Sequence, residues 1–68
     1  MKILITGGSG FIGTTAMEWA LSKYKVVNLD IRPPKILEHQ QHWRYIDIRD
    51  AQSFTDALVE FQPTHILH

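Results

Sequence analysis

Residues 7–13 are the segment that most constrains how this chain can fold. Gly8, Gly10 and Gly13 have the spacing G-x-G-x-x-G, and an apolar run precedes them. Gly7 adds the overlapping spacing G-x-x-G-x-x-G. Between a strand and a helix, such glycines permit a tight turn, a close approach of a phosphate to the backbone and close packing of the helix. Because a helix N-terminus also favours an anion, the segment predicts a strand–turn–helix unit that binds the pyrophosphate of a dinucleotide.

Four short runs rich in β-branched, aromatic or other apolar residues predict strands at Lys2–Thr6, Lys25–Asp30, Trp43–Asp47 and Thr64–His68. The runs alternate with helical or loop segments, which is typical of βαβ units in a parallel sheet. Right-handed crossovers and one switch of direction give the strand order 3-2-1-4. The predicted fold class is α/β, a partial Rossmann-type parallel sheet. We expect residues 1–68 to be the N-terminal part of such a domain, truncated after the fourth strand.

Two helices are expected between these strands. The first has an apolar stripe at helical spacing, predicted to face the sheet and formed by Ile12, Ala16, Trp19 and Ala20. The second has a similar stripe, formed by Phe54, Ala57, Leu58 and Phe61. Asp50 is placed to cap the second helix and Pro63 to end it. Residues 31–42 are expected to be a loop with at most a short helix, because Pro33-Pro34 forces extended backbone.

Asp30 ends the second predicted strand twenty residues after Gly10. A dinucleotide site has its ribose-binding carboxylate near this distance from the glycines. The negative charge would repel a 2′-phosphate, so the sequence favours NAD over NADP. Arg32 is a further candidate for the cofactor site, since an arginine here can accommodate that phosphate. For Arg32 and Lys35 we prefer the alternative that both are solvated loop charges.

Asp47 ends the third predicted strand and Ile48 follows it, beside Asp30 in the order 3-2-1-4. The carboxylate of Asp47 can accept a hydrogen bond from an adenine amino group, and Ile48 can pack on the ring. The alternative is that Asp47 only starts the turn before the next helix.

Other ligand classes are poorly supported. Gly8–Thr15 also fits a P-loop, but Thr14 replaces the lysine that meets the β and γ phosphates. The histidines His39, His42, His65 and His68 lack accompanying cysteines, so we expect no metal site. Seven Lys plus Arg balance seven Asp plus Glu, so nucleic acid is not an expected partner. No apolar run is long enough for a membrane span or a signal peptide, and we expect a cytoplasmic protein.

Three motifs together resemble the extended short-chain dehydrogenase/reductase family, the NAD-dependent epimerases and dehydratases of nucleotide sugars. Thr6–Gly13 resembles the glycine signature of that family, Asp30 its ribose acid and Asp47–Asp50 its adenine-contacting motif. Residues Thr64–His68 resemble its fourth strand. The cofactor-binding residues predicted from pattern and resemblance together are Gly7, Gly10, Phe11, Ile12, Gly13, Asp30, Arg32, Asp47 and Ile48.

The resemblance also implies that the catalytic part lies elsewhere. The family uses a Tyr-x-x-x-Lys pair, whereas Tyr24 is followed four residues later by Asn28, and Tyr45 by Arg49. We therefore assign no catalytic residue and expect the 68 residues alone to be inactive, with the nucleotide-sugar substrate bound by absent parts. The alternatives are a non-catalytic dinucleotide sensor or scaffold module and a reductase of a non-sugar substrate. A homodimer is one assembly that the family allows, but these residues select no oligomeric state.

Overall fold

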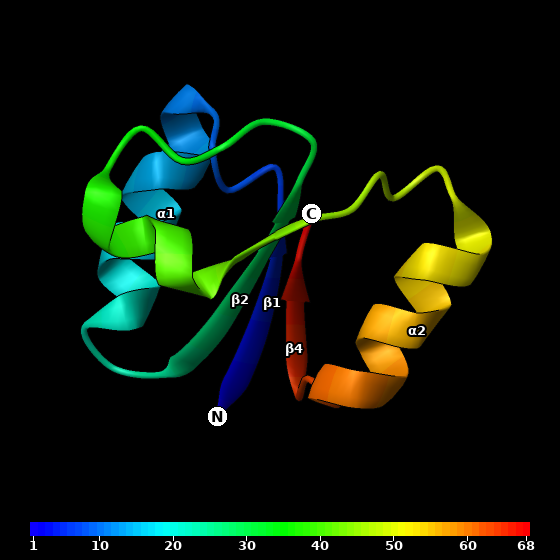
Figure 1. Ribbon diagram of the computed structural model, residues 1–68. Helices are drawn as coiled ribbons and strands as arrows, with labels where there is room; N and C mark the ends of the chain where they lie inside the picture. Colours follow the sequence, from blue (N-terminus) through cyan, green and yellow to red (C-terminus); the bar gives the residue numbers. More distant parts are fainter.

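A computed structural model describes all 68 residues as one sheet with helices on both faces. The four strands are parallel and lie in the order β3-β2-β1-β4, as predicted (Figure 1). Their bounds are Lys2–Thr6 for β1, Lys25–Asp30 for β2, Trp43–Tyr45 for β3 and His65–Leu67 for β4. The last two are shorter than predicted, because the backbone leaves the sheet after Tyr45 and enters it only at His65.

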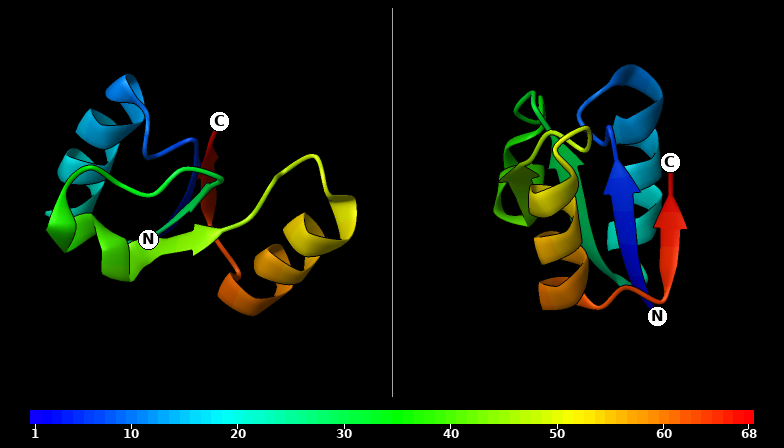
Figure 2. Two further views of the ribbon diagram at one scale, coloured as in Figure 1. Left: turned by 45° about the horizontal axis from the view of Figure 1, so that its top comes forward. Right: turned by 90° about the vertical axis from the view of Figure 1, so that its right-hand side faces the viewer.

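Three helical segments connect the strands: α1 (Phe11–Leu21), the 3-10 helix η1 (Leu37–His42) and α2 (Ala51–Phe61). Helices α1 and η1 cover one face of the sheet and α2 covers the other (Figure 2). Alternate residues of β1 therefore enter different cores: Ile3 and Ile5 pack toward α1, and Leu4 packs toward α2. This two-sided burial explains why β1 is apolar throughout.

The predicted sheet-facing stripe of α1 is wrong in part. Ile12 and Trp19 are 81% and 49% exposed, whereas Met17 and Ala20 are buried. The face that meets the sheet begins at Gly13, and Met17 and Ala20 follow it at i+4 and i+7. An apolar pattern does not count a glycine as a contact residue, so the sequence argument placed the stripe about one residue out of phase.

The second helix matches its prediction. The buried side of α2 contains Ala57, and three partly buried neighbours pack on the same core, namely Phe54, Leu58 and Phe61. Asp50 caps the helix by accepting a hydrogen bond from the amide of Ser53 at 3.3 Å. The Ser53 hydroxyl also donates to Asp50, and the two hydrogen bonds from Ser53 lower the pKa of the Asp50 carboxyl. The helix ends at Phe61, and Gln62 turns the chain in the left-handed conformation with φ 53° before Pro63.

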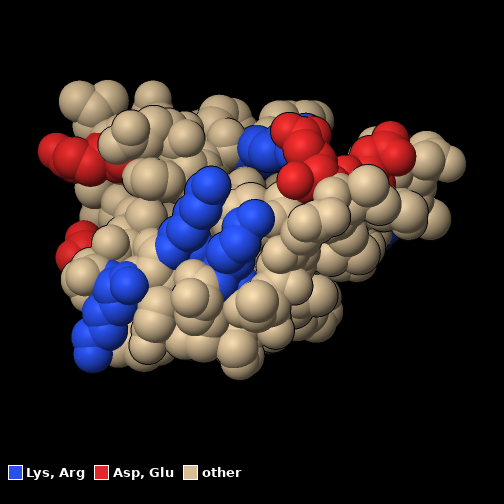
Figure 3. Space-filling view, turned by 90° about the horizontal axis from the view of Figure 1, so that it is seen from below, with Lys and Arg blue, Asp and Glu red and all other residues tan.

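The two ends of the sheet differ in character. At the end where the strands begin, basic side chains lie next to one another (Figure 3), and Lys2 pairs in register with Lys25. The other end carries the glycine turn and the loops after β2 and β3. None of the helices is of a length and hydropathy that would span a membrane.

Candidate functional site

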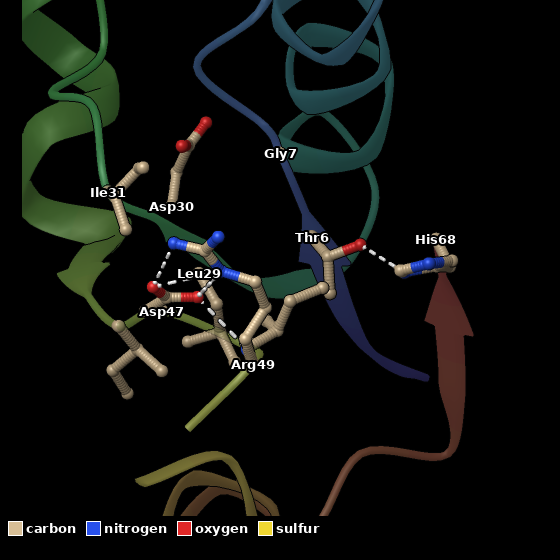
Figure 4. Close-up of a pocket in the computed structure, with 10 residues that line it drawn as sticks. Thr6, Gly7, Leu29, Asp30, Ile31, Asp47, Arg49 and His68 are labelled. Atoms are coloured by element: carbon tan, nitrogen blue, oxygen red, sulfur yellow. Dashed lines mark hydrogen bonds and ion pairs between the residues drawn. The ribbon is translucent and has the colours of Figure 1, made fainter. Parts of the chain in front are cut away.

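A cavity of about 480 Å³ opens at the carboxyl ends of the strands (Figure 4). Because parallel strands end at the same edge, their terminal residues surround it together. Its lining consists of Thr6, Gly7, Leu29, Asp30, Ile31, Ile46, Asp47, Ile48, Arg49 and His68. The cavity thus brings together predicted site residues from three separate segments, namely Gly7, Asp30 and the pair Asp47 and Ile48.

The glycine turn is fastened to the end of β2 through three consecutive amides. The amide of Gly7, at φ 72°, donates to the carbonyl oxygen of Leu29 at 3.0 Å. The next two amides donate to side chains of β2: Gly8 to Asn28 at 2.8 Å and Ser9 to Asp30 at 3.1 Å. The turn therefore has one defined position above the sheet.

Gly8 and Gly13 are required by their surroundings. A Cβ on Gly8 would lie 2.5 Å from the amide oxygen of Asn28, and one on Gly13 would overlap with the carbonyl oxygen of Gly7. Gly13 permits close packing at the start of α1, but the contact is with the turn and not, as the glycine pattern had predicted, with the strand.

The amides at the start of α1 are available to a ligand. The first main-chain hydrogen bond of this helix runs from the amide of Thr14 to the carbonyl oxygen of Gly10 at 2.8 Å, and Gly10 provides no side-chain cap. The preceding amides of Phe11, Ile12 and Gly13 make no hydrogen bond. None of these three residues lines the main cavity, and Phe11 is 88% exposed. These residues can thus contribute amide donors and the helix dipole to an anion.

Asp30 is 8% exposed, and both of its carboxylate oxygens accept main-chain hydrogen bonds. One accepts from Ser9 and the other from the amide of Arg32, each at 3.1 Å. A carboxylate has about four acceptor positions, so two remain beyond these two hydrogen bonds.

Arg32 is exposed, as expected for a loop charge, but its position is not arbitrary. One terminal nitrogen of its guanidinium lies 3.2 Å from the point that a Cβ of Gly10 would occupy. A positive charge therefore lies over the glycine turn. Lys35 is exposed on the loop and does not line the cavity.

Asp47 lies in the cavity but is engaged by Arg49. Its carboxylate accepts from the amide of Arg49 at 2.9 Å and from the terminal guanidinium nitrogen at 2.8 Å. These hydrogen bonds lower the pKa of Asp47 to about 2, and they raise that of Arg49. Ile48 is partly buried against the α2 core and presents apolar surface to the cavity.

Six lining residues were absent from the sequence prediction. Leu29, Ile31 and Ile46 are apolar, and the three with polar side chains are Thr6, Arg49 and His68. The Thr6 hydroxyl lies 2.8 Å from Nδ1 of His68, which joins the ends of β1 and β4 (Figure 4). Both residues also border a second cavity of about 280 Å³ on the α1 side. Ile12 and Gly13 line that second cavity, so Thr6 and Gly7 lie where the two hollows meet.

Neither tyrosine lies at the main cavity, and Tyr45 is 71% exposed. The structure contains no group of three or more His, Cys, Asp or Glu side chains that could hold a metal ion. The arrangement is suited to binding a ligand. It offers amide donors at the start of α1, carboxylate acceptors and apolar lining residues.

The sequence of residues 3–68 matches the model of the NAD dependent epimerase/dehydratase family. Two curated relatives are similar over nearly the whole chain. A probable dTDP-glucose 4,6-dehydratase of Sinorhizobium fredii is 32% identical over 100% of this chain and 22% of its own length. The N-acetyl-alpha-D-glucosaminyl-diphospho-ditrans,octacis-undecaprenol 4-epimerase of Escherichia coli O157:H7 is 31% identical over 97% of this chain and 19% of its own length. The chain thus spans about a fifth of these relatives.

Two solved structures share the fold. The UDP-glucose 4-epimerase of Thermus thermophilus, solved in complex with NAD, is 34% identical over 97% of this chain and 22% of that chain, with a TM-score of 0.81. The L-threonine dehydrogenase of Phytophthora infestans is 28% identical over 100% of this chain and 22% of that chain, with a TM-score of 0.84. The comparison with the dehydrogenase covers the whole chain and so includes the glycine turn, Asp30 and Asp47.

Proposed function

This chain belongs to the NAD dependent epimerase/dehydratase family, and on that premise we propose that its cavity holds the adenosine and pyrophosphate of NAD in an enzyme of nucleotide sugars. The observation that carries the proposal is the contrast among the turn amides. Those of residues 7–9 are bound to β2, whereas those of Phe11, Ile12 and Gly13 are free, and Ile12 and Gly13 border the second cavity. A pyrophosphate supplies acceptor oxygens for such amides.

The remaining cofactor contacts follow from the lining. The spare acceptor positions of Asp30 suit the adenosine ribose hydroxyls. The side chains of Ile31 and Ile48 offer apolar surface for the adenine. Asp47 can accept from the adenine amino group only by sharing its carboxylate with Arg49. The hollow beyond Thr6 and Gly7, bordered by Ile12, suits the nicotinamide half.

When bound, NAD supplies a nicotinamide that accepts and returns a hydride. The residues of this chain orient and bind it, and the acid–base groups belong to other parts of the protein. We therefore expect the 68 residues alone to show no turnover of a nucleotide sugar above the blank. Turnover by the purified 68-residue chain would contradict this division of labour.

The nucleotide-sugar assignment is supported by the relative named as a probable dTDP-glucose 4,6-dehydratase and by the similar structure of a UDP-glucose 4-epimerase. The other curated relative is a 4-epimerase of a sugar linked through a diphosphate to undecaprenol. A dehydrogenase of a non-sugar substrate is the second candidate, because one similar structure is an L-threonine dehydrogenase. Assays of the intact protein with dTDP-glucose, UDP-glucose and L-threonine in the presence of NAD distinguish these candidates. No turnover of any substrate together with tight NAD binding would instead favour a sensor or scaffold module.

Calorimetric titration of the intact protein with NAD, NADP and ADP-ribose tests the cofactor proposal. We expect NAD and ADP-ribose to bind with affinities within about tenfold of each other, because all the proposed hydrogen bonds lie in the shared ADP-ribose part. NADP should bind more weakly. The absence of NAD binding by the folded protein would overturn the proposal.

A further inference from the structure

Asn28 is the most buried polar side chain of the sheet, and its place is unusual. It lies inside β2 between the apolar residues Val27 and Leu29 and is 0% exposed. In the sheet it pairs in register with Ile5 of β1 and Trp43 of β3. A buried carboxamide without partners would be costly, so the hydrogen bonds that it makes decide its role.

Both ends of the Asn28 carboxamide bind the glycine turn. Its oxygen accepts from the amide of Gly8 at 2.8 Å, and its nitrogen donates to the hydroxyl of Ser9 at 3.0 Å. Ser9 is itself buried. The adjacent side chain of Asp30 takes the amide of Ser9, so one strand end holds two successive residues of the turn.

We propose that Asn28 is a positioning residue for cofactor binding, which holds the turn so that the free amides of α1 face the phosphates. The inference rests on the proposed function, because it assumes that NAD is the ligand. The free amides begin at Phe11, two residues after Ser9, so a shift of Ser9 moves the donors directly. A turn that is already fixed loses less conformational entropy when the ligand binds.

The same geometry excludes two amides from the phosphate site. The amide of Gly8 is taken by Asn28 and that of Ser9 by Asp30, so neither is available to a phosphate oxygen. Asn28 thus acts through the turn and does not touch the ligand. The contact between Asn28 and the turn also requires a glycine at position 8, because a Cβ there would displace the Asn28 carboxamide.

Three variants of the intact protein test this role. Asn28→Leu removes both hydrogen bonds at similar volume, Asn28→Asp keeps an acceptor for the Gly8 amide, and Ser9→Ala removes only the bond between the two side chains. Val26→Ala is the control, because Val26 is buried in the α1 core on the same strand and makes no contact with the turn in the hydrogen-bond network. Each is titrated with NAD at a temperature at which it is fully folded.

We expect Asn28→Leu to bind NAD about tenfold or more weakly, since it leaves the Gly8 amide without its buried partner. Asn28→Asp should bind more tightly than Asn28→Leu, and Ser9→Ala should lose about threefold. Val26→Ala should unfold more readily and bind NAD within twofold of the original protein. Original affinity in Asn28→Leu would overturn the proposal; if that variant does not fold, original affinity in Ser9→Ala would do so.

Amide hydrogen exchange without NAD separates this inference from the proposed function. In Asn28→Leu we expect the amides of Gly8 and Ser9 to exchange faster, relative to the amide of Leu4 in the core, than they do in the original protein. If Asn28→Leu does not fold, Asn28→Asp and Ser9→Ala are measured in its place. Unchanged ratios would show that Asn28 does not hold the turn. If the variants exchange faster as expected but the original protein binds no NAD, the proposed ligand is wrong while the anchoring by Asn28 stands.

Discussion

Gly13 packs against the carbonyl oxygen of Gly7, so closely that a methyl group at position 13 would overlap with it. Gly13→Ala therefore has two opposing effects on the stability of the protein. Alanine favours a helix by about 1 kcal/mol over glycine, but the overlap is with backbone that cannot rotate away. Overpacking of this kind typically costs about 1–3 kcal/mol.

We expect the overlap to dominate, so that Gly13→Ala lowers the free energy of unfolding and weakens NAD binding. Urea denaturation and NAD titration measure the two effects. Thr15→Ala, at an exposed position of the same helix, is the control: it raises helix propensity without the overlap, so it should neither lower the free energy of unfolding nor weaken NAD binding. A more stable Gly13→Ala variant with original affinity would show that the turn can move.

Asp30→Asn tests the choice between NAD and NADP. Two like unit charges about 4 Å apart, such as a carboxylate and a 2′-phosphate, repel each other by about 1 kcal/mol in water and about 4 kcal/mol at an effective dielectric constant of about 20. Asparagine keeps only one of the two oxygens that accept from the amides of Ser9 and Arg32, so the binding of both cofactors should weaken and the ratio of their dissociation constants is the informative quantity. We expect the ratio of the NADP to the NAD dissociation constant to fall by at least about tenfold, as measured by calorimetry.

The guanidinium of Arg32 should then become the residue that attracts the extra phosphate, because it lies over the turn at Gly10. Adding Arg32→Ala to Asp30→Asn is expected to weaken NADP binding again. Asp56→Asn, on the exposed side of α2, is the matched control. If Asp30→Asn left the NADP to NAD ratio unchanged, the charge of Asp30 would not determine the preference.

Much of the fold could be predicted because the apolar runs are distinct. The order of the strands and the Asp50 cap followed from run spacing and local chemistry. The phase of α1 did not, because Gly13 packs closely on the turn without contributing hydrophobicity. A prediction of packing from apolar periodicity misses contacts that depend on the absence of a side chain.

The candidate site was predictable only where its residues follow strands directly. Gly7, Asp30 and Asp47 were placed from the end of a strand, and all three line the cavity. The positions of Arg49 and His68 depend on how the loop after β3 and the end of β4 close over the cavity. The signal for Asn28 was present as a polar residue within an apolar strand, but its partners could not be known without the turn geometry.

Arg49→Ala is expected to raise the pKa of Asp47 from about 2 toward its ordinary value of 3.8. Since the pKa of Asp47 is lower in the folded protein, its contribution to stability is present above about pH 4 and is lost as the pH falls toward 2. Carboxyl NMR titration measures the shift. Arg44→Ala is the control, because Arg44 pairs with Glu60 instead. An unshifted Asp47 in Arg49→Ala would contradict the assigned cause.

Lys2 and Lys25 are like charges paired in register at the start of two neighbouring strands. Lys25→Glu should convert this repulsion into attraction and stabilise the protein by about 0.2–1 kcal/mol at low salt. The gain should shrink at high salt, because the pair is near the surface. Lys35→Glu, which makes the same charge change on an exposed loop, controls for net charge. Equal effects of both variants on denaturation would exclude a specific pair.

The outer edge of β4 leads to the last prediction, which concerns the 68-residue chain made alone. β4 pairs only with β1, and its residues Ile66 and Leu67 are 49% and 42% exposed. An apolar edge of this kind is a template for pairing with another chain. With 16 of 68 residues buried, the core of the chain is small, and the stability of a core of that size barely exceeds the cost in chain entropy. We therefore expect the isolated chain to be marginally folded or to self-associate.

Ile66→Lys should reduce this association, because a lysine on an edge strand opposes pairing with a second copy. Val59→Lys is the control, since Val59 is an exposed apolar residue of α2 away from the sheet edge. Light scattering during thermal unfolding, at several protein concentrations, compares the three chains. Ordinary domains of mesophiles unfold from about 45 °C upward. A sharp, concentration-independent unfolding transition of the monomeric original chain well above about that temperature would show that the β4 edge causes neither marginal folding nor association.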